Sequence, residues 1–144
     1  MIKRLLDIIL SAFALMLLSP ILLPVMVILK FTGEGEVFYR QERVGKGNKV
    51  FRITKFATML KESPNIGTGE YTLRNDPRVL PFGRFLRKSK INELPQLWDI
   101  LIGQMSIIGP RPQMVKVTAW YPEEYKLVLD KVRPGLSGIG SVIF

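Results

Sequence analysis

The chain has 144 residues, with 21 lysine and arginine residues against 12 aspartate and glutamate residues, a formal net charge of +9, and neither histidine nor cysteine. This length suits one domain with its own core, since domains typically contain about 100–150 residues. The missing residue types exclude disulfides, thiolate metal sites, cysteine nucleophiles and histidine-based acid–base catalysis, so any chemistry rests on carboxylates, Lys, Arg, hydroxyls, amides or a carboxylate-bound metal.

The first thirty residues form an apolar segment, although the chain as a whole is basic. Residues 5–29 carry a single charge, Asp7, and most charged residues follow Lys30. As a helix, this run extends about 37 Å, more than a hydrocarbon core of about 30 Å. Cleavage as a signal peptide is disfavoured, because the one small-residue site, at residues 12–14, lies inside the run. We therefore predict a membrane segment at 1–30, in contact with lipids, and a polar domain at 31–144.

Two features predict that this segment enters and leaves the bilayer on the same side. Pro20, preceded by Ser19 and followed by Pro24, lies inside the run, and an internal proline removes a backbone hydrogen bond and favours a kink near Ser19. Basic residues lie on both flanks: Lys3, Arg4, Lys30, Arg40, Arg43, Lys46 and Lys49. By the positive-inside rule both flanks are cytoplasmic, which a re-entrant helix broken at Ser19-Pro20 satisfies. An ordinary kinked span is the alternative.

A β-hairpin and a short amphipathic helix are predicted next. Apolar runs at 37–39 and 50–53 flank a glycine-rich stretch at 45–49, which predicts a hairpin. Gly45 and Gly47 lack the Lys-Ser/Thr ending of a P-loop, so turn chemistry is favoured over a phosphate cradle. Residues 61–81 are predicted to be irregular. The spacing of Phe82, Phe85 and Leu86 then predicts a helix whose other face is basic and suits anionic headgroups or substrate phosphates. A solvated charged face is the alternative.

The clearest helical pattern follows this basic segment. Apolar residues recur at helical spacing over 94–102, and Gly103 ends the pattern. Asn92 is a suitable N-cap, and Pro95 is tolerated in the first turn. Glu93 would then lie at the helix N-terminus, where the dipole favours an ionised carboxylate. Taken alone, this pair favours an ordinary structural helix, with Asn92 as its cap and Glu93 as a first-turn residue that matches the helix dipole.

The C-terminal third predicts a stiff loop and one more helix. Two prolines and a glycine at 108–112 exclude regular structure there and hold Arg111 in place. A helix is predicted after Pro122, with two acidic residues in its first turn and Lys131 in its last, and residues 133–135 end it. The apolar ending at 141–144 leads us to expect that the domain continues or that a partner covers this end.

Several short motifs occur in a fixed order along the chain. After Ser19-Pro20 they are RQERVG at 40–45, KFATM at 55–59, NDPR at 75–78, GRFLRK at 83–88, NELPQL at 92–97, GPRP at 109–112 and RPG at 133–135. In this order they resemble the bacterial sugar transferases, which are monotopic polyprenyl-phosphate phosphoglycosyl transferases. The resemblance covers almost the whole chain.

The resemblance implies an α+β fold with a re-entrant N-terminal helix, at the cytoplasmic face of the bacterial inner membrane. It implies transfer of a sugar 1-phosphate from a UDP-sugar to polyprenyl (undecaprenyl) phosphate, with release of UMP and use of Mg²⁺, as the first membrane step of surface polysaccharide or lipopolysaccharide synthesis. By resemblance, the catalytic positions are Asn92, Glu93 and Lys55, with Glu93 also helping to hold the metal. The positions that bind substrate phosphates are Arg78, Arg87 and Arg111, whose charges would neutralise a diphosphate.

Three positions depart from the family pattern. Asn92 stands where the family has an attacking aspartate, Ala57 where arginine is usual, and Gln104 where aspartate is common. A carboxamide is a far poorer phosphoryl acceptor than a carboxylate. The alternative is therefore an impaired or inactive membrane-docked homologue that binds the same ligands.

A nucleic-acid binder is a further class to which the charge of +9 alone would point. The membrane segment and the scattered prolines disfavour that class, and we predict no nucleic-acid partner. The sequence leaves open the particular sugar, the glycan pathway and the oligomeric state.

Overall fold

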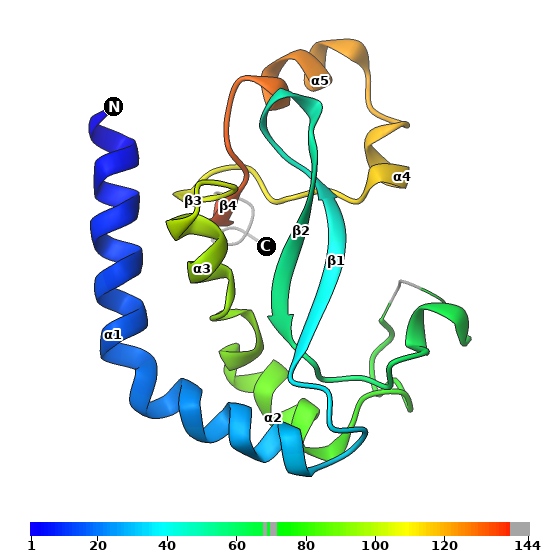
Figure 1. The fold of residues 1–144 in the computed structure, drawn as a ribbon. Coiled ribbons are helices and arrows are strands. Elements are labelled where there is room, and N and C mark those ends of the chain that lie inside the picture. The colour runs from blue at the N-terminus through cyan, green and yellow to red at the C-terminus, as the bar shows by residue number, and fades with distance from the viewer. Residues whose placement is uncertain (68, 70–71, 139–144) are drawn as a thin grey trace. The chain divides into compact units, whose positions relative to one another are not determined.

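A computed structural model describes residues 1–67, 69 and 72–138 of the chain (Figure 1). It divides into two compact units, a first unit of Met1–Leu17, Arg40–Thr54 and Gln96–Phe144, and a second unit of Leu18–Tyr39 and Lys55–Pro95. The predicted α+β class is confirmed, since a long apolar helix precedes several short helices and a β-hairpin. The predicted boundary at residue 30 divides the chain by polarity, whereas the two compact units divide it by packing. The predicted boundary therefore stays a prediction.

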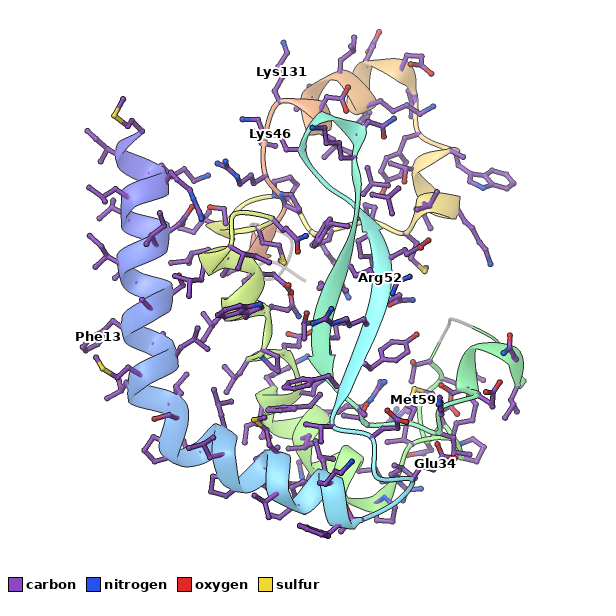
Figure 2. All side chains as sticks on the ribbon, viewed as in Figure 1. Phe13, Glu34, Lys46, Arg52, Met59 and Lys131 are labelled. Atoms are coloured by element: carbon purple, nitrogen blue, oxygen red, sulfur yellow. The ribbon has the colours of Figure 1, made fainter. Side chains whose placement is uncertain are left out.

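The apolar segment is one helix, α1 (Ile2–Phe31), with Pro20 and Pro24 inside it. Many of its large apolar side chains are exposed, and Figure 2 shows Phe13 pointing outward. Of the helices in the described part of the chain, α1 alone has the length and composition needed to cross a bilayer. Within α1 the boundary between the two compact units falls between Leu17 and Leu18, one residue before Ser19. The predicted kink and membrane insertion stay predictions.

Within the first unit, polar side chains bind the start of α1 to a later part of the chain. The Arg4 guanidinium donates to the carbonyl oxygens of residues 100 and 101, at 2.5 and 2.8 Å, and so caps the end of α3 (Gln96–Leu101). Asp7 is buried and accepts hydrogen bonds from the Ser106 hydroxyl at 2.7 Å and from the Ile107 amide at 3.2 Å. The only charge inside the apolar run therefore has a structural partner.

The predicted hairpin is confirmed. Strands β1 (Phe38–Val44) and β2 (Val50–Phe56) pair, and the short helix η1 (Lys46–Asn48) joins them. Gly47 and Asn48 have φ of +71° and +57°, a region that glycine and asparagine adopt at low cost. The Gly45 amide donates to the Lys49 carbonyl at 2.8 Å, which closes the turn. The glycines thus serve a turn, as the sequence predicts.

The rest of the first unit contains two further helices and a small parallel sheet. The elements are β3 (Ser106–Ile108), α4 (Val115–Thr118), α5 (Glu123–Asp130) and β4 (Gly135–Ser137). Strand β3 pairs with β4, with Ser106 opposite Gly135 and Ile108 opposite Ser137. The expectation of no regular structure from residue 108 is therefore wrong at Ile108, because β4 supplies the backbone partners that the loop sequence does not reveal. The predicted helix after Pro122 is confirmed as α5, but it ends at Asp130, so Lys131 is its C-cap and not part of its last turn. The apolar ending at 141–144 lies outside the described residues.

The second unit contains the remaining short helices: η2 (Ser63–Asn65), α2 (Pro81–Ser89) and η3 (Ile91–Glu93). Its buried apolar residues include three at helical spacing on the later half of α1, the last residue of β2 and the residue after it, and one residue of α2: Leu22, Val25, Leu29, Phe56, Ala57 and Leu86. Glu34, labelled in Figure 2, accepts the Lys61 amide at 2.7 Å and so ties the end of α1 to the loop after β2. The predicted amphipathic helix is confirmed as α2.

Candidate functional site

Five of the six residues expected to contact substrate belong to the second unit. They are Lys55 on β2, Arg78 in the loop before α2, Arg87 on α2, and Asn92 and Glu93 in η3. The sixth, Arg111, belongs to the first unit. Asn92, Glu93 and Arg87 lie in consecutive elements, α2 and η3, so the second unit carries a candidate site by itself.

The Asn92–Glu93 pair lies in a 3₁₀ turn rather than at a helix N-cap. The amides of Glu93 and Leu94 donate to the carbonyls of Lys90 and Ile91, and α3 begins only at Gln96. The expected capping role of Asn92 is therefore wrong. Pro95, which has no N–H to donate, separates the two helices, and the fixed φ of proline suits the start of α3.

The Asn92 side chain is buried, at 9% exposed, and its Oδ1 atom accepts no hydrogen bond from any described residue. A buried acceptor without a protein donor is costly unless a water, an ion or a ligand satisfies it. Glu93 is half-buried beside it in the sequence. Amide and carboxylate oxygens are the donors that hard divalent cations prefer, so this adjacent pair suits such a cation.

No cluster of three or more acidic, cysteine or histidine residues suited to a metal occurs in the described part of the chain. A magnesium ion does not need such a cluster when a phosphate substrate is present. It retains waters and is often held by one or two carboxylates plus substrate phosphate oxygens. Asn92 and Glu93 therefore fit a cation that is completed by the substrate.

Arg87 uses only part of its guanidinium for hydrogen bonds within the described protein. Its Nε donates to the Thr58 hydroxyl at 2.7 Å. Among the described residues neither Nη atom donates to protein. Burial lowers the pKa of Arg87, and the negative charges of Asp76 and Glu93 oppose that shift. The side chain stays cationic, because the ordinary pKa of arginine lies above 12.

Arg78 has a different environment, although it lies only nine residues from Arg87. It is 5% exposed, and its Nε and Nη2 atoms donate to both carboxylate oxygens of Asp76, at 2.9 and 2.6 Å. Its Nη1 donates to the carbonyls of Ser63, Ile66 and Gly69 at 2.5–2.7 Å. Every nitrogen of the guanidinium therefore serves the 63–78 loop. A phosphate-binding role for Arg78 stays a prediction.

The Asp76–Arg78 pair also has an electrostatic signature. The side-chain hydrogen bond from Arg78 holds the pKa of Asp76 well below its ordinary range, and backbone amides of Arg78 and Leu73 act in the same direction. Asp76 in turn raises the pKa of Arg78. This pair, quoted in the sequence only as part of the NDPR motif, is the main electrostatic connection of the loop.

Lys55 and Arg111 complete the set. Lys55 is half-buried near the end of β2. Arg111 is exposed and lines a pocket of about 300 Å³ together with two tyrosines whose ring centroids are 6.3 Å apart. The pocket residues are Pro110, Arg111, Gln113, Tyr121, Pro122, Tyr125 and Leu129, all in the first unit. The catalytic and phosphate roles of Lys55 and Arg111 stay predictions.

Sequence reasoning missed two residues of this site, Thr58 and Asp76. Both occur inside quoted motifs, next to residues with larger charges. The i, i+2 spacing of Asp76 and Arg78 around a proline is a signal that a turn brings the pair together. No local signal identifies Thr58, because its partner Arg87 lies 29 residues later.

The fold and the site together define a small α+β domain with an apolar N-terminal helix and cationic and acidic side chains suited to a phosphate ligand. The chain matches the model of the bacterial sugar transferase family over residues 1–144. It belongs to this family, which confirms the resemblance seen in the sequence motifs.

Curated relatives agree with this assignment. The chain is 40% identical over 144 residues to the UDP-N-acetylgalactosamine-undecaprenyl-phosphate N-acetylgalactosaminephosphotransferase of Aeromonas hydrophila, which covers 99% of the chain and 34% of that protein. It is 38% identical over 140 residues to the UDP-glucose:undecaprenyl-phosphate glucose-1-phosphate transferase of Escherichia coli K12, covering 96% of the chain and 30% of that protein. The chain thus spans about a third of the length of these relatives.

A shorter relative is covered more fully. The exopolysaccharide production protein ExoY of Rhizobium meliloti is 37% identical over 156 residues, which cover 99% of the chain and 69% of that protein. The match therefore includes a relative whose length lies closer to that of this chain.

Proposed function

We propose that this chain transfers a sugar 1-phosphate from a UDP-sugar to polyprenyl (undecaprenyl) phosphate and releases UMP. The observation that carries the proposal is the environment of the Arg87 guanidinium. Its Nη atoms make no hydrogen bond to the described protein, and its charge interacts with that of Glu93. Family membership and the names of the relatives support the same reaction.

The residues of the second unit suit this chemistry. In the overall reaction, the sugar-linked phosphorus forms a bond to a phosphate oxygen of the prenyl acceptor, and its bond to the bridging oxygen breaks, so UMP leaves with that oxygen. Negative charge moves along the diphosphate as this occurs. Fixed cations near a shifting charge lower the barrier, a role suited to Arg87 and, by the family pattern, to Lys55 and Arg111.

The proposed metal is Mg²⁺, held by the Glu93 carboxylate together with the Asn92 amide oxygen. When bound, it would neutralise diphosphate charge and favour departure of UMP. The buried Oδ1 atom of Asn92, which has no protein donor among the described residues, supports an oxygen-ligand role for this side chain. Such a role does not require the negative charge that aspartate would bring.

We further propose that α1 is re-entrant and that both of its ends face the cytoplasm. In the first unit, its start is bonded through Arg4 and Asp7 to residues 100–107 of the polar chain. In the second unit, the segment after its end is bonded through Glu34 to Lys61. A helix of 30 residues is about 45 Å long, so a straight span would separate its two ends by a bilayer. Attachment of both ends to the polar chain favours a turn within the membrane instead.

The proposed reaction belongs to surface polysaccharide synthesis, and the names of the relatives support this proposal. One of them is an exopolysaccharide production protein, and others act on undecaprenyl phosphate. The inner bacterial membrane is the corresponding location, with its lipids as neighbours of α1. Exopolysaccharide and lipopolysaccharide synthesis are both compatible with this chemistry.

A second candidate function is that of a membrane-docked homologue that binds the same ligands without turnover. One observation favours it: Asn92 replaces the attacking carboxylate of the family, and a carboxamide is a poor phosphoryl acceptor. Both candidates require the same ligand contacts, so only an activity measurement separates them.

The test is UMP release by the full chain in lipid nanodiscs, with undecaprenyl phosphate, Mg²⁺ and a panel of UDP-sugars. We expect release with at least one UDP-sugar, loss of release with EDTA, and loss in Glu93→Gln. Release that persists unchanged in Glu93→Gln would show that the site is assigned wrongly. Turnover by Asn92→Asp but not by the unchanged chain would establish the non-catalytic candidate.

A further inference from the structure

We propose that Thr58 is a positioning residue for the anion-binding arginine: its hydroxyl holds the Nε–H of Arg87 and thereby directs the two Nη groups toward a substrate phosphate. The inference deepens the proposed function and rests on it. Thr58 itself does not touch substrate in this account. It acts through Arg87.

The hydrogen bond selects one edge of the guanidinium. Arginine binds oxyanions in two ways, through the pair Nη1 and Nη2 or through Nε and one Nη, and both are bidentate. In this chain the Thr58 Oγ1 atom occupies Nε at 2.7 Å. Only the Nη1–Nη2 edge remains available for a bidentate ligand, so the geometry fixes the direction from which a phosphate binds.

Thr58 is itself rigidly held against α2. It is buried, and its carbonyl accepts the Leu80 amide at 2.9 Å, at the residue preceding the helix. One turn further on, a Cβ at Gly83 would lie 2.2 Å from the same carbonyl oxygen, a contact that only glycine avoids. Arg87 follows Gly83 by four residues, so both lie on the same face of α2. The hydroxyl and the guanidinium therefore belong to one tightly packed contact.

The chemistry of the acceptor explains why a hydroxyl suits this position. Arg78 donates to a carboxylate, which neutralises its charge within the protein. Thr58 is neutral, so it fixes the orientation of Arg87 without cancelling its charge. A carboxylate in place of the hydroxyl would hold the same N–H and compete with the phosphate. The neutral contact leaves the positive charge for the ligand.

The test is a binding measurement that does not depend on turnover. UDP is titrated by calorimetry, with Mg²⁺, into the full chain in nanodiscs and into Thr58→Val, Thr58→Ser, Arg87→Gln and the double variant Thr58→Val/Arg87→Gln. Thr118→Val is the matched control. Thr118 is also buried, and its hydroxyl donates to the Met114 carbonyl rather than to an arginine.

We expect Thr58→Val to weaken UDP binding about 10-fold or more, the usual effect of losing a hydrogen bond to a charged group. Thr58→Ser keeps the hydroxyl and should restore affinity to within about twofold, and Thr118→Val should leave it unchanged. The double variant should bind no more weakly than Arg87→Gln, because Thr58 acts only through that side chain.

Three outcomes would overturn the inference. Thr58→Val binding as tightly as the unchanged chain would show that the hydroxyl does not position Arg87. Additive losses in the double variant, or equal losses in Thr58→Val and Thr58→Ser, would show that the effect is general destabilisation. Absence of UDP binding by the unchanged chain, together with absence of UMP release from every UDP-sugar, would instead refute the proposed function on which the inference rests.

Discussion

The contact between Gly83 and Thr58 gives the sharpest prediction about this site. In Gly83→Ala, the new Cβ would lie 2.2 Å from the Thr58 carbonyl oxygen and 2.8 Å from the carbonyl carbon and Cα, whereas ordinary contact begins at 3.4 Å. All three of these Thr58 atoms belong to the backbone, so no side-chain rotation relieves the clash. The helix and the 57–59 segment must separate by about 1 Å, and overpacking of this kind costs about 1–3 kcal/mol.

Helix propensity acts in the opposite direction and sharpens the test. Alanine is favoured over glycine inside a helix by about 1 kcal/mol, so a helix without a tertiary clash would gain stability. We expect a lower unfolding temperature for Gly83→Ala and weaker UDP binding, since the shift also lengthens the bond from Arg87 to Thr58. Gly47→Ala is the control: it meets no atom within 4 Å and should leave UDP binding unchanged despite its φ of +71°. Higher stability with unchanged UDP affinity in Gly83→Ala would refute the reasoning.

Two further predictions concern the buried acidic residues. Asp7→Ala leaves the Ser106 hydroxyl and the Ile107 amide without their acceptor, which should cost about 2–4 kcal/mol in chemical unfolding, with a smaller loss in Asp7→Asn; equal stability of all three proteins would contradict the anchoring role. Asp76 has a lowered pKa in the fold, so its stabilising effect is complete above about pH 4 and is lost as the pH falls below that value. As the pH falls from about 5 to about 3, the free energy of unfolding should therefore decrease less in Asp76→Asn than in the unchanged chain. Equal decreases in the two proteins would argue against the pairing of Asp76 with Arg78.

The parts of the fold that were predictable from the sequence have a local signature. The hairpin is marked by its glycine-rich turn, and α2 and α5 are marked by apolar residues at helical spacing and by proline at their starts. The β3–β4 pairing has no such signature. It joins Ser106 to Gly135, each strand has three residues, and the pairing depends on a contact between segments that are distant in the sequence. Short strands of this kind are specified by tertiary contacts rather than by pattern.

The candidate site was predictable to a similar extent. Motif order identified Arg87, Asn92 and Glu93 before any geometry was known. It did not reveal that Asn92 lies in a 3₁₀ turn, because the helix start depends on how Pro95 fits between two short helices. The contact of the Thr58 hydroxyl was equally hidden, since its partner Arg87 lies 29 residues later in the sequence. Sequence motifs identify the charged residues of the candidate site, but the partners of these residues are set by tertiary packing.

The contrast between Arg78 and Arg87 shows why such partners decide function. Both side chains are basic, both lie in motifs of the family, and the family resemblance implies phosphate binding for both. In the fold, all three guanidinium nitrogens of Arg78 donate to the carboxylate or carbonyls of its own loop. Arg87 donates only Nε, to a neutral hydroxyl, and it remains within electrostatic range of Glu93.

Because the two arginines differ in how many of their donors bond within the protein, we expect them to have different roles. Replacing Arg78 removes the bonds that hold the 63–69 carbonyls together, so its loss should appear first in stability. Replacing Arg87 removes one bond within the protein and the charge offered to a ligand, so its loss should appear first in UDP affinity. Because both arginines belong to the second unit, this separation depends on no assumption about the placement of Arg111. Charge alone therefore does not distinguish an arginine that stabilises the loop from one that binds a ligand. The number of its N–H donors that already bond within the protein does.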